Sequence, residues 1–249
     1  MKREVIVVTA AYGHQQIAAL GGQQALLPII ARAGADGVEI RRELLSEKEL
    51  QNLPQLAAAI AEQQLFSFLS VPEALFTADG TLNPQLDQRV AEAQQLNARL
   101  VKFSLGNYQH GFDCQALQQR LNDYPLQVVV ENDQTEYGTI ARLQEFFTDC
   151  AATADPCFMT FDLANWLWVG DDAFAAAAQL GRYVSYVHVK TATAHQQSFR
   201  AIALDEAGND WRGLIKRLPA GAPRGIEFPL EGDDLVAVTR HYVNLVREA

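Results

Sequence analysis

Eight short runs rich in β-branched and aromatic residues recur along the chain at similar intervals. They cover residues 4–10, 37–41, 65–71, 100–106, 126–132, 157–164, 184–190 and 224–230. Dividing the 249 residues among eight runs leaves about 31 residues for each, enough for a strand, a helix and two connections. The one wide interval, between residues 190 and 224, predicts an additional loop. This repeat restricts the chain to folds in which strands and helices alternate.

Helical patterns lie between these runs. In residues 82–100, Asn83 is a candidate N-cap, Pro84 fits the first helical position, and apolar residues follow at spacings of four and three. Strands that alternate with helices eight times predict an α/β fold, a single-domain (β/α)₈ TIM barrel over residues 1–249. A doubly wound open sheet is the alternative.

The composition is typical of a soluble globular protein. Hydrophobic residues make up 49% of the chain and charged residues 20%. No apolar run approaches the ~18 residues that a membrane-spanning helix needs, so we expect no membrane partner. The first fourteen residues contain a short run of valines followed by Tyr12 and Gly13, which predicts a first strand and not a signal peptide.

Charge and cysteine content narrow the partners and the compartment. Acidic residues number 30 against 20 basic residues, which gives a formal net charge of -10. Such a field repels polyanions, so nucleic acid is not an expected partner, whereas a homo-oligomer is compatible with the sequence. Cys114, Cys150 and Cys157 are an odd number without a C-x-x-C pair. They indicate reduced thiols and therefore a cytoplasmic protein.

Four consecutive predicted strands end in side chains that can bind a cation: Glu131, Asp162, His188 and Glu227. Each residue alone is more often a salt-bridged or structural group than a ligand, but the strand ends of a barrel meet at one mouth. Three carboxylates gathered there repel one another, and a divalent cation relieves that repulsion. Oxygen ligands with one imidazole suit Mn²⁺, Mg²⁺, Co²⁺ or Zn²⁺. We expect one such ion per chain, with Mn²⁺ as the first candidate.

The motifs around these residues resemble a known family. "VVVEND", "FDLAN", "VHVKT" and "GIEFPL", in this order, are similar to the strand-end motifs of the xylose isomerase-like TIM barrel superfamily of sugar phosphate isomerases and epimerases. That superfamily also includes ketose 3-epimerases, hydroxypyruvate isomerase, inosose dehydratase and endonuclease IV. The resemblance implies a metal held by Glu131, Asp162, His188 and Glu227, with the two glutamates also acting as catalytic acid and base.

Five further residues are candidates for substrate binding. Lys190 and Lys102 are expected to point into the barrel by strand alternation, and the indole of Trp166 could stack on a sugar. Arg200 lies in the predicted extra loop and could reach the tail of a substrate. Asn165 stands where epimerase-like members commonly have a histidine. Because an amide does not titrate near neutrality, a proton-transfer step at that position is not expected here.

Three charged residues close the second predicted strand. We interpret Glu39, Arg41 and Arg42 as an ion-pair group that supports the barrel rim.

The leading functional hypothesis is a metal-dependent isomerase or epimerase that acts on a sugar or sugar phosphate through a cis-enediolate. The alternative is a dehydratase or lyase, because the same intermediate can expel a β-hydroxyl. An abasic-site endonuclease is disfavoured by the five histidines and the net charge of -10. A non-catalytic sugar-binding protein is disfavoured by the intact Glu131 and Glu227.

Overall fold

The computed structural model describes residues 3–151, 157–208 and 210–249, and it has eight parallel strands that close into a barrel. The barrel strands are β1 (Val5–Val8), β2 (Gly37–Arg41), β3 (Phe66–Phe76), β4 (Ala98–Gly106), β5 (Gln127–Glu131), β6 (Phe158–Asp162), β7 (Val184–Val189) and β10 (Arg224–Ile226). Each falls in or overlaps one of the eight predicted runs. Pairing of β1 with β10 completes the ring, which confirms the predicted barrel and rules out an open sheet.

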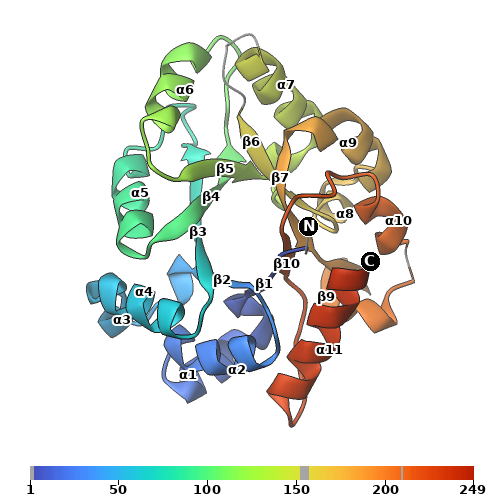
Figure 1. Ribbon diagram of the computed structural model, residues 1–249. Helices are drawn as coiled ribbons and strands as arrows, with labels where there is room; N and C mark the ends of the chain where they lie inside the picture. The colour runs from blue at the N-terminus through green and yellow to red at the C-terminus, as the bar shows by residue number, and fades with distance from the viewer. Residues whose placement is uncertain (1–2, 152–156, 209) are drawn as a thin grey trace.

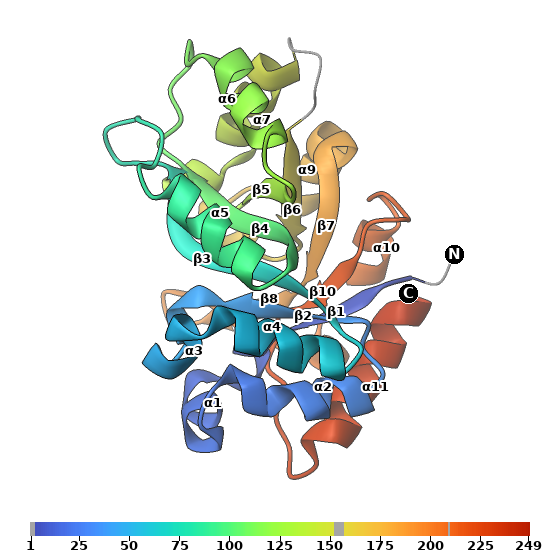
Figure 2. The same cartoon turned by 60° about the vertical axis from the view of Figure 1, so that its left-hand side comes forward.

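Helices surround the barrel on its outer side (Figure 1). They are α1 (His14–Leu20), α2 (Leu27–Arg32), α3 (Glu47–Gln51), α4 (Leu53–Glu62), α5 (Leu86–Gln95), α6 (Cys114–Asn122), α7 (Ile140–Ala151), α8 (Trp166–Val169), α9 (Ala173–Leu180), α10 (Trp211–Ile215) and α11 (Leu235–Glu248). Figure 2 shows α4 and α5 along the outside of the barrel, where they contact β3 and β4. Apolar residues on the outward face of each strand pack against this shell.

The start of α5 differs from the sequence prediction. Asn83 is not the N-cap, because the helix begins at Leu86. The side chain of Asn83 instead accepts a hydrogen bond from Gln85 N at 2.8 Å and donates one to Ala74 O at 2.7 Å. Asn83 therefore ties the turn before the helix to β3.

An apolar layer fills the lower barrel. It consists of the inward-facing side chains of Ile6, Phe68, Leu100, Val129 and Tyr186. Because side chains alternate between the two faces of a strand, the residue two positions further along points into the same interior. Two positions beyond Phe68, Leu100, Val129 and Tyr186 the sequence has polar residues, so a polar layer lies next to the apolar one, toward the strand ends. Its members are Ser70, Lys102, Glu131 and His188.

The segment between β7 and β10 is not the plain loop that the spacing predicted. It forms an antiparallel hairpin of β8 (Thr191–His195) and β9 (Ser198–Ile202), followed by α10. Gln196 at the turn has a positive φ of 54°. The hairpin packs on α8, since the rings of Phe199 and Trp168 lie 5.4 Å apart. Local strand pairing satisfies backbone groups that an open loop would leave to water.

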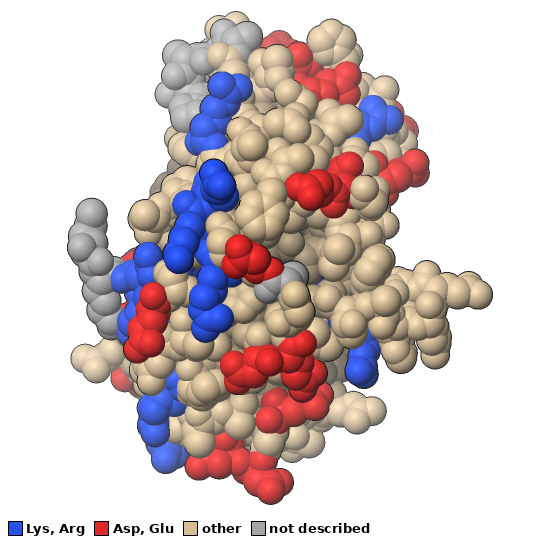
Figure 3. Space-filling model, turned by 90° about the vertical axis from the view of Figure 1, so that its right-hand side faces the viewer, with Lys and Arg blue, Asp and Glu red and all other residues tan. Residues whose placement is uncertain are grey.

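The surface and the cysteines add two observations. On the face shown in Figure 3, basic side chains form a band, and acidic side chains lie next to it and between its members.

None of the described helices is both long and apolar enough to cross a membrane. Cys114, Cys150 and Cys157 are all buried, and none of them forms a disulfide.

Candidate metal centre

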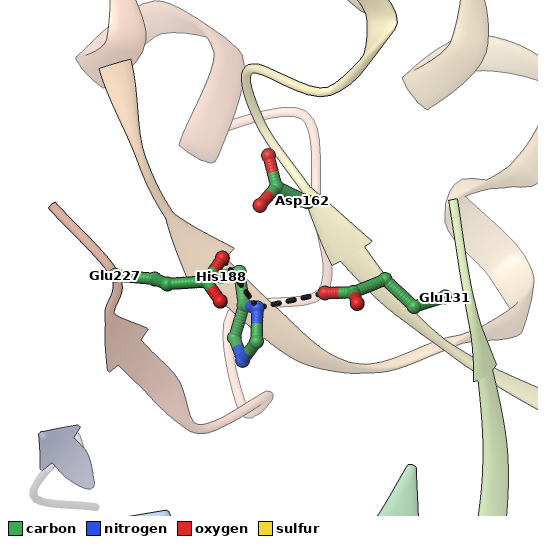
Figure 4. Close-up of side chains that lie close together, drawn as sticks. All are labelled: Glu131, Asp162, His188 and Glu227. Carbon is green, nitrogen blue, oxygen red and sulfur yellow. Dashed lines mark ion pairs between the residues drawn. The ribbon is translucent and has the colours of Figure 1, made fainter. Parts of the chain in front are cut away.

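The four strand-end residues predicted as ligands lie together in the structure. Glu131 is the last residue of β5, Asp162 is the last residue of β6, and His188 is the penultimate residue of β7. Glu227 follows directly after β10. Each offers one ligand atom, and these atoms all lie within 4.8 Å of one another. Figure 4 shows the three carboxylates converging around the imidazole.

Each of these residues has one polar atom held by the surrounding protein, while its other polar atom faces the group of ligand atoms. Lys102 Nζ donates a hydrogen bond to Glu131 Oε2 at 2.7 Å, and Arg41 Nη1 donates one to Glu227 Oε1 at 2.6 Å. Glu131 Oε1 is buried and lies 2.7 Å from His188 Nδ1. The second oxygen of Glu227 lies 3.2 Å from His188 Nδ1.

Asp162 and His188 follow the same arrangement. Asp162 Oδ1 accepts hydrogen bonds from the backbone N–H groups of Ala164 at 2.8 Å and Asn165 at 2.9 Å. His188 Nε2 lies 2.7 Å from Glu39 Oε2. The remaining atom of Asp162, Oδ2, is buried without a hydrogen bond in the described part of the chain, whereas His188 Nδ1 lies 2.7 Å from Glu131 Oε1.

The unpaired Asp162 Oδ2 and the donor types of its neighbours test whether the residues suit a metal ion. Buried polar atoms normally have a hydrogen-bond partner, because leaving one unpaired costs about 1–3 kcal/mol. Asp162 Oδ2 is such an atom, and it lies in the same group as the carboxylates of Glu131 and Glu227 and the Nδ1 atom of His188. One imidazole nitrogen with carboxylate oxygens is a donor set that divalent cations accept. The residues present therefore fit a divalent metal ion.

Asn165 belongs to the wall of this group. Its side-chain amide donates to Asn132 O at 2.9 Å, while its carbonyl oxygen accepts from Gln134 Nε2 at 3.0 Å and from Lys190 Nζ at 3.2 Å. Lys190 Nζ also lies 3.6 Å from Asp162 Oδ2. Asn165 thus orients Lys190 beside the ligands.

The cations next to the carboxylates shift their pKa values. Burial alone would raise the pKa of Glu131, but Lys102 and His188 outweigh it and lower that pKa. The pKa of Glu227 is lowered well below its usual value against the effect of burial, by Lys190 and His188. Both glutamates are therefore ionised near neutral pH and able to accept a proton.

The pKa values of Asp162 and His188 are raised, in contrast to those of the two glutamates. Burial raises the pKa of Asp162 to about 7, although Lys190 opposes this shift. Burial lowers the pKa of His188, but the carboxylates of Glu39, Glu227 and Glu131 together outweigh burial and raise it well above its usual value. In the metal-free protein His188, and below about pH 7 also Asp162, therefore holds a proton that a metal ion has to displace.

The structure gives Glu39 and Arg41 other roles than the support of the barrel rim that we predicted from the sequence. Glu39 is not at the rim: it is fully buried, and His188 and Lys102 lower its pKa to about 2 against the effect of burial. Arg41 reaches Glu227, whereas Arg42 pairs with Glu92 at 2.5 Å. The alternation in "GVEIR" contained the signal, because Val38 and Ile40 face the helices and leave the opposite face of the strand to Glu39 and Arg41.

The other candidate substrate-binding residues occupy three different places. Lys102 has a side chain that is only 2% exposed, and it lies behind Glu131. Trp166 packs on Phe161, on the outward face of β6, and lines a separate cavity of about 230 Å³. Arg200 lines another pocket, between the hairpin and α11. The structure does not bring Trp166 or Arg200 into the group of ligands.

A different indole lies beside the mouth. The ring centroid of Trp168 is 5.8 Å from Lys190 Nζ. The position of Trp168 just past Asp162 in the sequence already made it a candidate for stacking on a sugar, but its neighbour Phe199 comes from the unpredicted hairpin, for which the sequence contained no clear signal.

No protein-family model matches the chain, and no curated protein matches it in sequence. Solved structures match closely in shape. The probable 3-DHS dehydratase AsbF from Bacillus anthracis has a TM-score of 0.71 at 12% identity, with 98% of each chain covered. An L-ribulose 3-epimerase has a TM-score of 0.67 at 17% identity, over 100% of this chain and 95% of the other. The IOLI protein, solved with a bound zinc atom, has a TM-score of 0.72 at 10% identity, over 98% of this chain and 97% of the other.

These neighbours have the same fold as this chain. The resemblance stated from the sequence motifs is therefore confirmed at the level of the fold. Epimerases and a dehydratase both occur among proteins with this barrel.

Proposed function

We propose that this protein is a metal-dependent enzyme that isomerises or epimerises a sugar or a sugar phosphate. One observation carries the proposal: Glu131 and Glu227 approach the imidazole of His188 from opposite sides, within one group of ligand atoms (Figure 4). Two ionised carboxylates on opposite sides of a bound substrate can remove a proton from one face and return it to the other. The epimerases with the same barrel support this reading.

A divalent ion held by Glu131, Asp162, His188 and Glu227 would supply Lewis acidity, which makes the C–H beside a substrate carbonyl easier to ionise. One glutamate removes that proton, and the substrate passes through a cis-enediolate. Return of the proton by the other glutamate inverts the carbon, and return to the neighbouring carbon interconverts aldose and ketose. Mn²⁺ is the first candidate ion, with Mg²⁺, Co²⁺ and Zn²⁺ as alternatives.

Lys190 and its neighbours would bind the substrate. The side chain of Lys190 is 12% exposed and lies 3.3 Å from Glu227 Oε2, so its ammonium group can donate a hydrogen bond to a hydroxyl or carbonyl oxygen. Trp168 next to it offers an apolar ring face. A small, hydroxyl-rich molecule matches this combination.

The second candidate is a dehydratase or lyase, and Lys190 is the observation that favours it. Its ammonium group lies between Asp162 and Glu227, at 3.6 Å and 3.3 Å, where it can donate a proton to a leaving hydroxyl. The probable dehydratase with the same barrel supports this alternative.

The proposal is tested by incubating the metal-loaded protein in D₂O with ketoses, keto-sugars and their phosphates. We expect deuterium to enter beside the carbonyl of at least one compound, as followed by NMR, with a product of unchanged mass apart from deuterium. Loss of water from the product would instead identify the dehydratase. Neither exchange nor product across the panel would contradict both and favour a sugar-binding protein.

A further inference from the structure

The carboxylate of Glu39 lies behind the imidazole of His188, on the side away from the other ligands. Glu39 Oε2 is 2.7 Å from His188 Nε2, and both side chains are fully buried. The opposite ring nitrogen, Nδ1, lies 2.7 Å from Glu131 Oε1 and 3.2 Å from Glu227 Oε2. Each ring nitrogen therefore contacts a carboxylate, but only Nδ1 faces the group of four candidate ligands.

A carboxylate at one ring nitrogen determines where the proton of a neutral imidazole sits. Glu39 can only accept a hydrogen bond when it is ionised, so Nε2 carries the proton and donates it. Nδ1 is then left with its lone pair, which is the form that binds a metal ion. Without a metal ion, Nδ1 lies 2.7 Å from Glu131 Oε1, so a metal ion that binds there replaces a ring proton that faces this carboxylate.

Lys102 connects Glu39 to the second ligand. Its ammonium group lies 3.6 Å from Glu39 Oε1 and 2.7 Å from Glu131 Oε2. The contacts form a closed ring through His188, Glu39, Lys102 and Glu131. A carboxylate this deeply buried needs a nearby cation, and Lys102 is 2% exposed at the same level of the barrel.

Packing holds the imidazole in this orientation. The ring of Tyr186 lies below it, at 4.9 Å between centroids and an angle of 79°. On one side, a Cβ atom at Gly225 would come within 3.1 Å of His188 Cδ2, so the ring fills the space left by the glycine. Rotation of the ring that exchanges its nitrogens would require these neighbours to move.

We propose that Glu39 is a positioning residue, which holds His188 with the proton on Nε2 and thereby makes Nδ1 the metal-binding atom. Lys102 supplies the positive charge that this buried carboxylate requires and turns Glu131 toward the same ion. The inference rests on the proposed metal site, and it adds a residue to that site from the far side of the barrel.

The first test measures zinc affinity by calorimetry in the wild type, in Glu39→Gln and in Glu49→Gln. Glu49 is the matched control, because it is a second buried glutamate, but its carboxylate is bonded to Ser46 and Gln24 outside the barrel. We expect Glu39→Gln to weaken zinc binding about 10- to 100-fold and Glu49→Gln to retain the wild-type affinity. Wild-type affinity in a folded Glu39→Gln protein would overturn the inference and leave the metal site standing.

The second test uses the wild-type protein, so it does not depend on how a variant folds. Long-range ¹H–¹⁵N spectra of the zinc-loaded protein distinguish a protonated ring nitrogen from a metal-bound one, and a His188→Asn variant assigns the signals. We expect the proton on Nε2 and zinc on Nδ1, and the reverse assignment would overturn the inference. Failure of the wild type to bind zinc would contradict the metal site itself, which separates the two hypotheses.

Discussion

Arg41 and Glu227 join the ends of two barrel strands that are not neighbours, since β1 lies between β2 and β10. Arg41 Nη1 is 2.6 Å from Glu227 Oε1. A charge-assisted hydrogen bond of this kind holds one carboxylate oxygen and leaves the other turned toward His188 and Lys190. The orientation of a proposed catalytic base thus depends on a residue 186 positions away in the chain.

Replacement of this arginine should impair catalysis without unfolding the protein. We expect Arg41→Met to lower turnover of the substrate found in D₂O by about 10- to 100-fold, because Glu227 loses its fixed orientation. Arg42→Met is the control, since Arg42 pairs with Glu92 and not with the site. Steady-state kinetics with circular dichroism would measure both. Equal activities in the two variants would remove Arg41 from the mechanism.

The two glutamates can be tested by exchanges that keep their volume. Glu131→Gln and Glu227→Gln should each reduce turnover by about 10²-fold or more, because an amide cannot accept the substrate proton. Glu136→Gln, an exposed position near Glu131, should have wild-type activity. Near-normal rates in either of the first two variants would exclude that residue as a base.

Metal removal should lower stability. The purified or metal-reconstituted protein is expected to carry about one divalent ion per chain, which a chelator removes. At a free metal concentration 100 times the Kd, binding stabilises the folded state by about 2.7 kcal/mol. For a domain of this size that corresponds to a shift in Tm of roughly 5–10 °C. Elemental analysis that finds no stoichiometric metal in either preparation would contradict the site.

Metal affinity should rise with pH. Asp162, whose pKa is raised to about 7, and His188, whose pKa is also raised, are protonated below those values and must lose protons to bind the ion. Each displaced proton makes the affinity fall about tenfold per pH unit as the pH drops below the corresponding pKa. Calorimetry at pH 6 in buffers of different ionisation enthalpy should detect proton release. An affinity that is constant between pH 5.5 and 7 would contradict these pKa shifts.

The absence of a side chain at Gly225, next to Tyr186 and His188, should contribute to the stability of the protein. A Cβ atom at position 225 would lie 2.1 Å from Tyr186 Oη, so Gly225→Ala forces the barrel interior apart. We expect the free energy of unfolding to fall by about 1–3 kcal/mol in urea denaturation. Gly221→Ala, where nothing lies within 4 Å of the added atom, should change it by less than about 0.5 kcal/mol. Similar values for the two variants would show that the interior adapts.

The sequence by itself determined that strands and helices alternate eight times, which favoured a barrel over an open sheet, and it indicated the strand ends that carry the candidate ligands. Local patterns carry this information, because hydrophobic runs and helix signals depend on residues near one another in the chain. The same patterns placed Glu131, Asp162, His188 and Glu227 at successive strand ends. The hairpin β8–β9 was missed because its runs are short and mostly exposed.

Only the tertiary structure decided which charged groups meet. Glu39 and His188 are 149 residues apart, and their contact exists because closure of the ring brings β2 and β7 to face the same interior. The sequence analysis interpreted Glu39 and Arg41 as part of an ion-pair group on the rim, because it could not show which partners these side chains reach. A strand's alternation tells which side chains point inward, but the partner of an inward side chain depends on strand order, register and packing across the barrel, which are properties of the closed fold.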